Sequence, residues 1–140
     1  MIGWLVDTGP LVAYLDAGDP RHGEVANRLE DFSGQLATTS AVITEAMHFV
    51  SASKRGPRLL AEFVATSRTE VSVVCRPPEL LEAAILMGRY VDTPMDFADA
   101  TLVLLAEALE VRDILTLDRR GFSTYRTRRG RGFRLVLDAP

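Results

Sequence analysis

Four carboxylates in this sequence occupy positions where an acid is unusual. Asp7 and Asp118 each come directly after a short apolar run, while Glu45 and Asp99 each lie among small and apolar neighbours. A buried carboxylate is costly unless it is paired with a cation or bound to a metal ion. Cations are scarce nearby, because the chain has a single lysine, Lys54, and its arginines are concentrated toward the carboxyl end. The pattern therefore predicts a cluster of acids that a metal ion neutralises.

The residue types favour a hard divalent ion. Two like charges 4 Å apart repel by roughly 4 kcal/mol at an effective dielectric constant of 20, so a bare cluster is unfavourable or partly protonated. Mg²⁺ or Mn²⁺ removes this repulsion, binds carboxylate and water oxygens, and leaves positions for a phosphate group and an attacking water. The histidine and cysteine set that zinc prefers is missing, since the chain has two histidines and one cysteine.

Three of the acids also have a purely structural interpretation. Asp7 can cap the helix that follows it, Asp96 fits the first turn of a later helix, and Asp118 can close a turn. Glu45 and Asp99 lack such an alternative, because neither lies near an expected helix end. The histidines fit helix positions better than catalytic ones, and the sequence contains no serine or cysteine nucleophile motif and no glycine-rich phosphate loop.

Short apolar segments alternate with helical patterns along the chain. We expect strands at about 2–6, 36–39, 71–75, 113–118 and 133–137. We expect helices at about 11–15, 19–32, 40–53 and 58–67, one beginning at 78, and one at about 94–109. Asp19 is expected to cap the second helix, and Pro94 to lie in the first turn of the last. Alternating strands and helices indicate a parallel sheet covered on both faces.

The position of the acids follows from this sheet. If the strands at 2–6 and 114–117 are parallel core strands, Asp7 and Asp118 emerge from the same edge. Ligands of open α/β sheets bind at that edge. Asp96 and Asp99 lie three apart on the long helix and therefore share one face.

Several burial predictions follow from the apolar pattern. The helix beginning at Pro78 is expected to bury one face, made of Leu80, Leu81, Ala84, Ile85 and Met87. The helix at 94–109 is apolar nearly all round and is expected at the centre of the fold. Cys75 lies in an apolar segment expected to form a buried strand and is interpreted as an inert core thiol.

Length and charge limit the number of domains and the kinds of partner that fit the sequence. A chain of 140 residues predicts a single domain, residues 1–140, with a sizeable core. The net charge of −3 is unevenly distributed along the chain. Residues 1–118 carry 9 basic and 18 acidic side chains, a net −9, whereas residues 119–140 carry 7 arginines and one acid, a net +6. This asymmetry indicates either a polyanionic partner or a solvated arginine-rich face. With no leader-like or membrane-spanning segment, a cytoplasmic protein that does not bind membranes is expected.

The motifs, taken together and in order, resemble those of the PIN-domain ribonucleases, specifically the VapC-type toxins of toxin–antitoxin pairs. The resemblance rests on residues 6–15 (VDTGPLVAYL), 19–22 (DPRH), 39–45 (TSAVITE), 96–100 (DFADA) and 116–118 (TLD). It implies a three-layer α/β/α sandwich around a parallel sheet of about five strands. It also implies a metal site for Mg²⁺ or Mn²⁺ made of Asp7, Glu45, Asp99 and Asp118, with Asp96, Thr8 and Thr116 as accessory residues.

The resemblance further implies an endoribonuclease that inhibits translation or growth, forms a homodimer and is held inactive by a cognate VapB-type antitoxin. Its expected substrate is structured RNA such as tRNA or rRNA. The family pattern does not require the arginine-rich tail, which we expect just past Asp118, where it can hold the RNA backbone. The arginines assigned to this role are Arg119, Arg120, Arg126, Arg128 and Arg129. Three alternatives remain: a PIN-type nuclease without an antitoxin, an acid-based metal phosphohydrolase, and a non-catalytic RNA-binding module. The usual motif of the phosphohydrolases is incomplete here, because Gly9 replaces its second acid.

Overall fold

The computed structural model describes residues 1–138, in which five parallel strands form one sheet. The strands are β1 (Ile2–Val6), β2 (Gln35–Thr39), β3 (Glu70–Ser72), β4 (Asp113–Leu115) and β5 (Arg134–Leu135), in the order β3-β2-β1-β4-β5. The helices are α1 (Thr8–Leu15), α2 (His22–Glu30), α3 (Ser40–Val50), α4 (Gly56–Ser67), α5 (Pro77–Arg89), α6 (Phe97–Leu109) and α7 (Arg119–Thr124), and a 3₁₀ turn covers Val136–Asp138.

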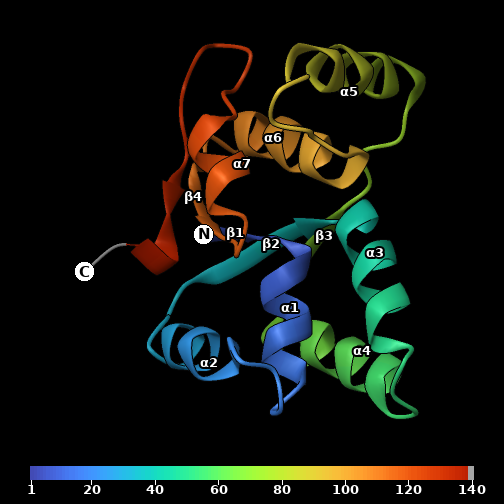
Figure 1. Cartoon of the computed structure of the whole chain (residues 1–140), viewed down its shortest axis with the longest axis vertical. Coiled ribbons are helices and arrows are strands. Elements are labelled where there is room, and N and C mark those ends of the chain that lie inside the picture. Colours follow the sequence, from blue (N-terminus) through green and yellow to red (C-terminus); the bar gives the residue numbers. More distant parts are fainter. Residues whose placement is uncertain (139–140) are drawn as a thin grey trace.

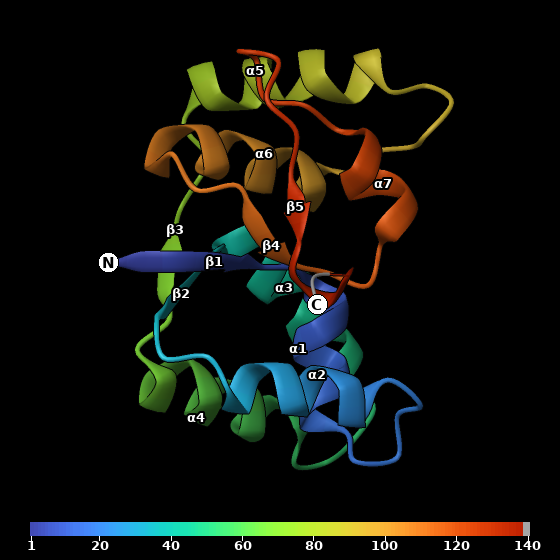
Figure 2. The same ribbon diagram turned by 90° about the vertical axis from the view of Figure 1, so that its left-hand side faces the viewer.

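Helices cover both faces of the sheet, as the sequence predicts. α5 and α6 lie on one side, and α1, α2 and α4 lie on the other (Figures 1 and 2). The parallel pairing of all neighbouring strands requires crossovers, which the helices provide. The predicted three-layer α/β/α sandwich with five parallel strands is confirmed. The helices within residues 1–138 are all too short or too polar to span a bilayer.

The core is built on the central strand and the central helix. β1 lies between β2 and β4, so its apolar run is covered on both faces, and Leu5 and Val6 are fully buried. α6 packs against β1 and β2 and is buried without interruption from Ala100 to Ala106. The prediction that this helix is central is confirmed.

The predicted burial of the strand near residue 73 is wrong. β3 spans only three residues and forms the edge of the sheet, so it pairs with β2 alone. Val71 and Val73 are exposed, and Cys75 is exposed as well, so it is not a core thiol. An edge strand leaves one side and part of its faces to solvent, which the apolar composition alone does not reveal.

The predicted buried face of α5 is also wrong. α5 packs on α6, and it buries Ala83 and Leu86 rather than the residues beside them. Leu81 is 66% exposed and Ile85 57% exposed. A stripe at helical spacing therefore faces solvent in residues 1–138; it consists of Leu81, Ala84, Ile85 and Gly88.

Two helix starts differ from the predicted ones. Asp19 does not cap α2, because its carboxylate accepts a hydrogen bond from the backbone N–H of Arg21 within the preceding turn, and the helix begins at His22. Pro94 lies before α6 rather than inside its first turn, and Asp96 is the N-cap residue. As a result, Asp19 lies in the loop before α2, and Asp96 lies just before α6 and not inside it.

Candidate active site

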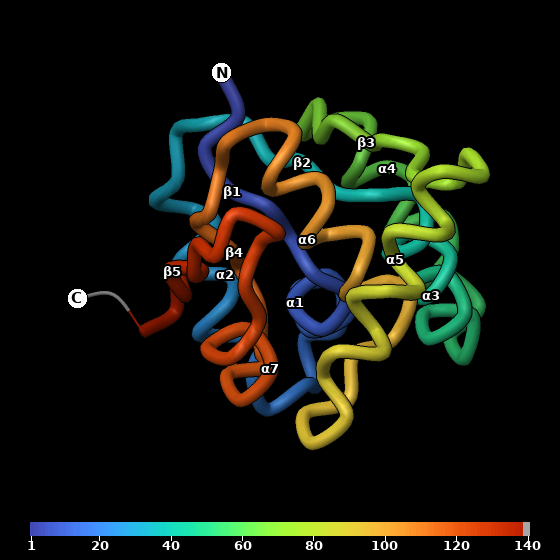
Figure 3. Tube along the Cα trace, turned by 90° about the horizontal axis from the view of Figure 1, so that it is seen from above, coloured from blue at the N-terminus to red at the C-terminus, as the bar shows by residue number. Residues whose placement is uncertain are grey.

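An open cavity of about 500 Å³ lies where β1 and β4 end. The starts of α1, α6 and α7 gather at this end of the sheet (Figure 3). Six carboxylates line the cavity: Asp7, Asp19, Glu45, Asp96, Asp99 and Asp118. All four predicted metal ligands are among them, although they come from four separate parts of the chain. The sheet edge predicted from the strand pattern is therefore where these acids lie.

Asp7 ends β1 and is held from two sides. It is 7% exposed. Its Oδ1 accepts a hydrogen bond from the backbone N–H of Thr8 at 2.8 Å, and its Oδ2 accepts one from the hydroxyl of Thr116 at 2.8 Å. The Thr116 hydroxyl in turn accepts from the backbone N–H of Asp118 at 3.0 Å. Asp7 therefore caps α1 and also lines the cavity. The hydroxyl of Thr116 links the residues that follow β1 and β4 through its two hydrogen bonds.

Thr8 contributes the one buried side-chain oxygen or nitrogen atom in residues 1–138 that has no hydrogen-bond partner. Thr8 follows Asp7 in the sequence, belongs to the wall of the acidic cavity and is 5% exposed. Buried polar atoms are nearly always hydrogen-bonded to protein, water or a ligand. The Thr8 hydroxyl is therefore an exception within residues 1–138.

Asp96 and Asp99 brace each other at the start of α6. Asp96 Oδ1 accepts from the Asp99 N–H at 2.8 Å, and Asp99 Oδ2 accepts from the Asp96 N–H at 3.1 Å. The prediction that Asp99 lies away from a helix end is wrong, because α6 begins only at Phe97. Each carboxylate uses one oxygen in this reciprocal cap and keeps the other for the cavity. The positive end of the α6 dipole favours negative charge here.

Asp118 and Glu45 approach the cavity from the two remaining sides. Asp118 is the N-cap residue of α7, and its Oδ1 accepts from the Gly121 N–H at 2.9 Å. Glu45 lies one turn inside α3 and is half-buried, and within residues 1–138 it makes no side-chain hydrogen bond or ion pair. The site thus combines four acids held by capping bonds, Asp7, Asp96, Asp99 and Asp118, with Glu45, which has no such bond within residues 1–138.

The electrostatics of the cavity show a shortage of positive charge. Burial raises the pKa of Asp7 from 3.8 to about 6, against the lowering effect of hydrogen bonds from Thr116 and Thr8. Burial, followed by the charges of Asp7 and Asp96, raises the pKa of Asp99 above its ordinary value. A cation would let both carboxylates ionise.

The donor set suits Mg²⁺ or Mn²⁺, because every charged group in the cavity is a carboxylate. In residues 1–138, no three histidine, cysteine, aspartate or glutamate side chains converge on one metal position as they stand. Binding an ion therefore requires rotation of side chains around the cavity, for which Glu45 and the free oxygens of Asp96 and Asp99 are available.

Asp7→Asn is expected to stabilise the metal-free protein relative to the parent as pH rises from about 4 to 6. The parent carboxyl has a pKa of about 6 when folded and 3.8 in its ordinary state, so its contribution to stability is lost as pH rises through that interval. The full loss corresponds to roughly 3 kcal/mol. Asparagine does not titrate, although it weakens the bond to Thr116. Thermal unfolding in EDTA at several pH values checks this, and parallel pH profiles for the two proteins would contradict it.

Gly121→Ala is expected to displace Asp118 and lower activity. A Cβ at position 121 would press on the Asp118 carboxylate, 2.8 Å from its carboxyl carbon, and lie 3.0 Å from the ring of Tyr125. The carboxylate has to rotate away, so we expect a loss of roughly tenfold or more in kcat/KM, in line with the cost of misplacing a catalytic group. RNA cleavage and a melting curve measured together check this. Full activity in a normally folded variant would show that Asp118 keeps its place or has no part in the reaction.

The predicted arginines do not form one group beside Asp118. Arg119 and Arg120 begin α7 next to it, and Arg119 pairs with Asp138 at 3.2 Å. Arg128 instead forms ion pairs with Glu82 of α5 and Glu107 of α6. The expectation that Arg128 lies just past Asp118 is therefore wrong, and Arg129 lines a separate cavity with Glu107, whereas the guanidinium of Arg126 stays at the end of α7.

Five residues on the wall of the cavity are not among the predicted site residues: Gly9, Val12, Asp19, Phe49 and Leu117. Asp19 was assigned to a helix cap, yet it lines the cavity from the loop between α1 and α2. Its position directly before Pro20 was the available signal, since such a pair favours a turn over a helix interior. Phe49 also lines the cavity and is 55% exposed. Its place on an apolar helix face gave no signal of this.

The parallel α/β/α sandwich, with a carboxylate-lined cavity at the strand ends, is a PIN-like fold. Among solved structures, the chain is similar to VapC20 of Mycobacterium tuberculosis, described as a sarcin-ricin loop cleaving toxin. The TM-score is 0.68 and the identity 21%, over 80% of this chain and 87% of that one. It is also 32% identical over 134 residues to ribonuclease VapC26 of Mycobacterium tuberculosis (strain ATCC 25618 / H37Rv), covering 94% of this chain and 98% of that protein. No family model matches the chain. The chain belongs to the VapC family of PIN-domain ribonucleases.

Proposed function

We propose that this chain is a toxin of a toxin–antitoxin pair that hydrolyses RNA phosphodiester bonds with Mg²⁺ or Mn²⁺ in the acidic cavity. The observation that carries the proposal is the meeting of Asp7, Glu45, Asp99 and Asp118 at the end of the sheet in a chain of the VapC family. Capping accounts for Asp7, Asp99 and Asp118 one by one, but it does not require them to share a cavity with Glu45, and each negative charge raises the cost of burying the others.

The four carboxylates would hold the ion, and the protein contributes their placement. When bound, the ion supplies a water of lowered pKa and positive charge beside the phosphate. Thr116 fixes the rotation of Asp7 and the backbone of Asp118 with a single hydroxyl. The reciprocal cap at Asp96 holds Asp99 at the positive end of α6.

The proposal is tested by incubating purified protein with structured RNA. Suitable substrates are tRNA and an rRNA fragment containing the sarcin-ricin loop, the element named for VapC20. We expect cleavage at a defined position with Mg²⁺ or Mn²⁺, none in EDTA, and recovery when Mn²⁺ is restored. Cleavage that persists in EDTA would contradict the proposal. Release of phosphate from nucleotides without RNA cleavage would indicate a phosphohydrolase, and binding without cleavage would indicate a binding module.

We propose that the protein forms a homodimer through the solvent-facing stripe of α5. Leu81 and Ile85 are more than half exposed and lie beside Ala84 and Gly88 on one face of the helix. Contiguous apolar surface of this kind is typical of interaction sites. Light scattering is expected to give twice the chain mass of 15.4 kDa. A monomer at micromolar concentration would contradict the assignment.

The proposed inhibitor is a VapB-type antitoxin, and both proteins are expected in the cytoplasm, where the RNA is. A cavity of about 250 Å³ between α1, α3 and α4 is lined by apolar residues that include Leu15 and Leu59. Val12 and Phe49 line both this cavity and the acidic one, so a bound segment would cover the way to the carboxylates. Co-expression with the neighbouring reading frame is expected to restore growth and to yield a stable complex.

A further inference from the structure

The segment between α7 and β5 contains a rigid turn, which we call the basic turn (residues 127–131). The Thr127 N–H donates to the carbonyl of Arg131 at 2.9 Å, and the Gly130 N–H donates to the carbonyl of Thr127 at 2.8 Å. The hydroxyl of Thr127, which is buried, accepts from the Arg131 N–H at 3.1 Å. Gly130 has a φ of +82°, a conformation that suits glycine. The backbone of the turn is therefore fixed before any partner binds.

Arg128 fastens the basic turn to the helical layer above the sheet. Its guanidinium lies 2.7 Å from Glu82 of α5 and 3.0 Å from Glu107 of α6, and its backbone N–H also donates to Glu107 at 3.1 Å. The charge of Arg128 is thus neutralised within the protein. In Figure 2 the loop that contains the turn rises beside α5.

Two other arginines of the turn keep their charge. Arg129 and Arg131 are exposed and form no ion pair within residues 1–138. They share a small cavity with Arg112, which donates only to the carbonyl of Gly132, at 3.2 Å. Three arginines therefore line one small cavity, and two of them, Arg129 and Arg131, belong to the fixed turn.

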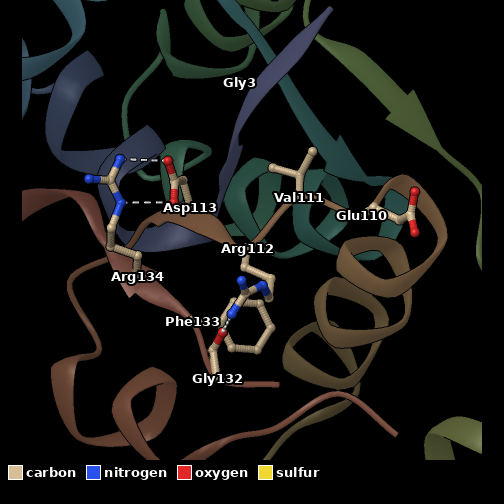
Figure 4. Close-up of a pocket in the computed structure, with 8 residues that line it drawn as sticks. All are labelled: Gly3, Glu110, Val111, Arg112, Asp113, Gly132, Phe133 and Arg134. Carbon is tan, nitrogen blue, oxygen red and sulfur yellow. Dashed lines mark hydrogen bonds and ion pairs between the residues drawn. The ribbon is translucent and has the colours of Figure 1, made fainter. Parts of the chain in front are cut away.

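A broader hollow adjoins this group at the amino end of the sheet. It has a volume of about 610 Å³, and Arg112 belongs to its wall as well (Figure 4). Arg134 lies on the same wall but pairs with Asp113 at 2.6 Å, so its charge is already matched. Arg112, Arg129 and Arg131 therefore have no ion-pair partner within residues 1–138, and the acids that share their small cavity are Glu110 and Glu107, which Arg128 already holds.

The basic turn lies well away from the acidic cavity. Asp99 and Glu107 are eight residues apart on α6, which corresponds to about 12 Å along the helix axis. Asp99 faces the cavity, whereas Glu107 holds the turn. At about 3.4 Å of axis per phosphate in a stacked strand, this separation equals on the order of four nucleotides.

We propose that the basic turn is a second RNA-binding surface, which holds the phosphate backbone of a folded RNA while the acidic cavity holds the cleavage site. This proposal rests on the ribonuclease function proposed above. Six carboxylates line the acidic cavity and repel RNA, so much of the affinity has to come from basic groups outside it. A fixed backbone with two unmatched arginines provides such groups at little cost in entropy. A short oligonucleotide centred on the cavity does not reach them.

The test compares the double variant Arg129→Gln/Arg131→Gln with a control of equal charge, Arg55→Gln/Arg68→Gln, whose arginines are exposed at the two ends of α4. RNA binding is measured by fluorescence anisotropy in EDTA, so the result does not depend on cleavage. We expect the turn variant to bind folded RNA roughly tenfold more weakly or worse, with a salt slope shallower by about 1.4. Cleavage of a short oligonucleotide with the same site is expected to stay unchanged.

Other outcomes overturn the proposal. Equal loss in the two double variants would show a general charge effect, and equal loss for folded and short RNA would place the arginines at the cavity instead. Unchanged RNA binding with lost capture of the antitoxin would make the basic turn a protein-binding surface. If the parent binds RNA but cleaves neither substrate with metal, the proposed function fails while the anisotropy result still decides the role of the turn.

Discussion

Asp99→Asn is expected to lower kcat/KM for RNA cleavage by at least a hundredfold while the protein stays folded. Asparagine keeps the size of the side chain and can still accept the hydrogen bond from the Asp96 N–H, but it removes a charge from the cavity. A metal ion at a developing charge contributes several kcal/mol, and each 1.36 kcal/mol corresponds to a tenfold change in rate. The measurement is cleavage of structured RNA under saturating Mn²⁺, with a melting curve for each protein.

The control for this prediction is Asp31→Asn. Asp31 is exposed just after α2 and does not line the cavity, so its replacement changes the net charge equally and is expected to leave the rate unchanged. Asp7→Asn is expected to behave like Asp99→Asn. Cleavage by Asp99→Asn within twofold of the parent would mean that the cavity is not the active site or that the activity belongs to a contaminant.

Gly56→Ala is expected to destabilise the fold by about 3 kcal/mol, which lowers Tm by roughly 10 °C. Gly56 is buried at the start of α4, where the chain returns against the end of α3. A Cβ at this position would overlap the carbonyl oxygen of Val50 and lie 2.6 Å from its carbonyl carbon. Both atoms belong to the backbone, so relief requires a shift of one helix against the other.

Gly23→Ala provides the matched comparison for this effect. Gly23 lies in α2, and an added Cβ meets nothing within 4 Å. Alanine is the better helix former, so we expect an unchanged or slightly raised Tm. Thermal unfolding of the two variants beside the parent checks the prediction. Equal Tm values for Gly56→Ala and the parent would show that the connection between α3 and α4 is loose enough to absorb the methyl group.

The location of the acidic cavity could be predicted from the sequence because it follows from a topological rule. Asp7 directly follows β1 and Asp118 comes three residues after the end of β4, and parallel strands place their carboxyl ends at one edge. Glu45 and Asp99 were identified by their apolar neighbours. Their approach to the same edge depends on how α3 and α6 pack on the sheet, which the resemblance to a known family implied and periodicity alone did not.

The wrong predictions concern residues whose burial or pairing depends on tertiary contacts and cannot be decided from the local sequence pattern. α5 has apolar residues around more than half of its circumference, so its buried face depends on how it meets α6. Residues 71–75 have the composition of a buried strand, but β3 is Glu70–Ser72, and its place at the edge is set by the order of the strands. Arg128 pairs with a glutamate 21 residues earlier, a contact that no local pattern indicates.

The central claim, that the acidic cavity holds a divalent cation, is tested most directly by titrating the metal-free protein with Mn²⁺ and following the free ion by electron paramagnetic resonance. We predict saturable Mn²⁺ binding by the parent and by Asp31→Asn. Binding is expected to be at least tenfold weaker in Asp7→Asn and Asp99→Asn, because each substitution removes one charged ligand from a set made only of carboxylates. Equal Mn²⁺ binding by the parent and the two cavity variants would contradict it.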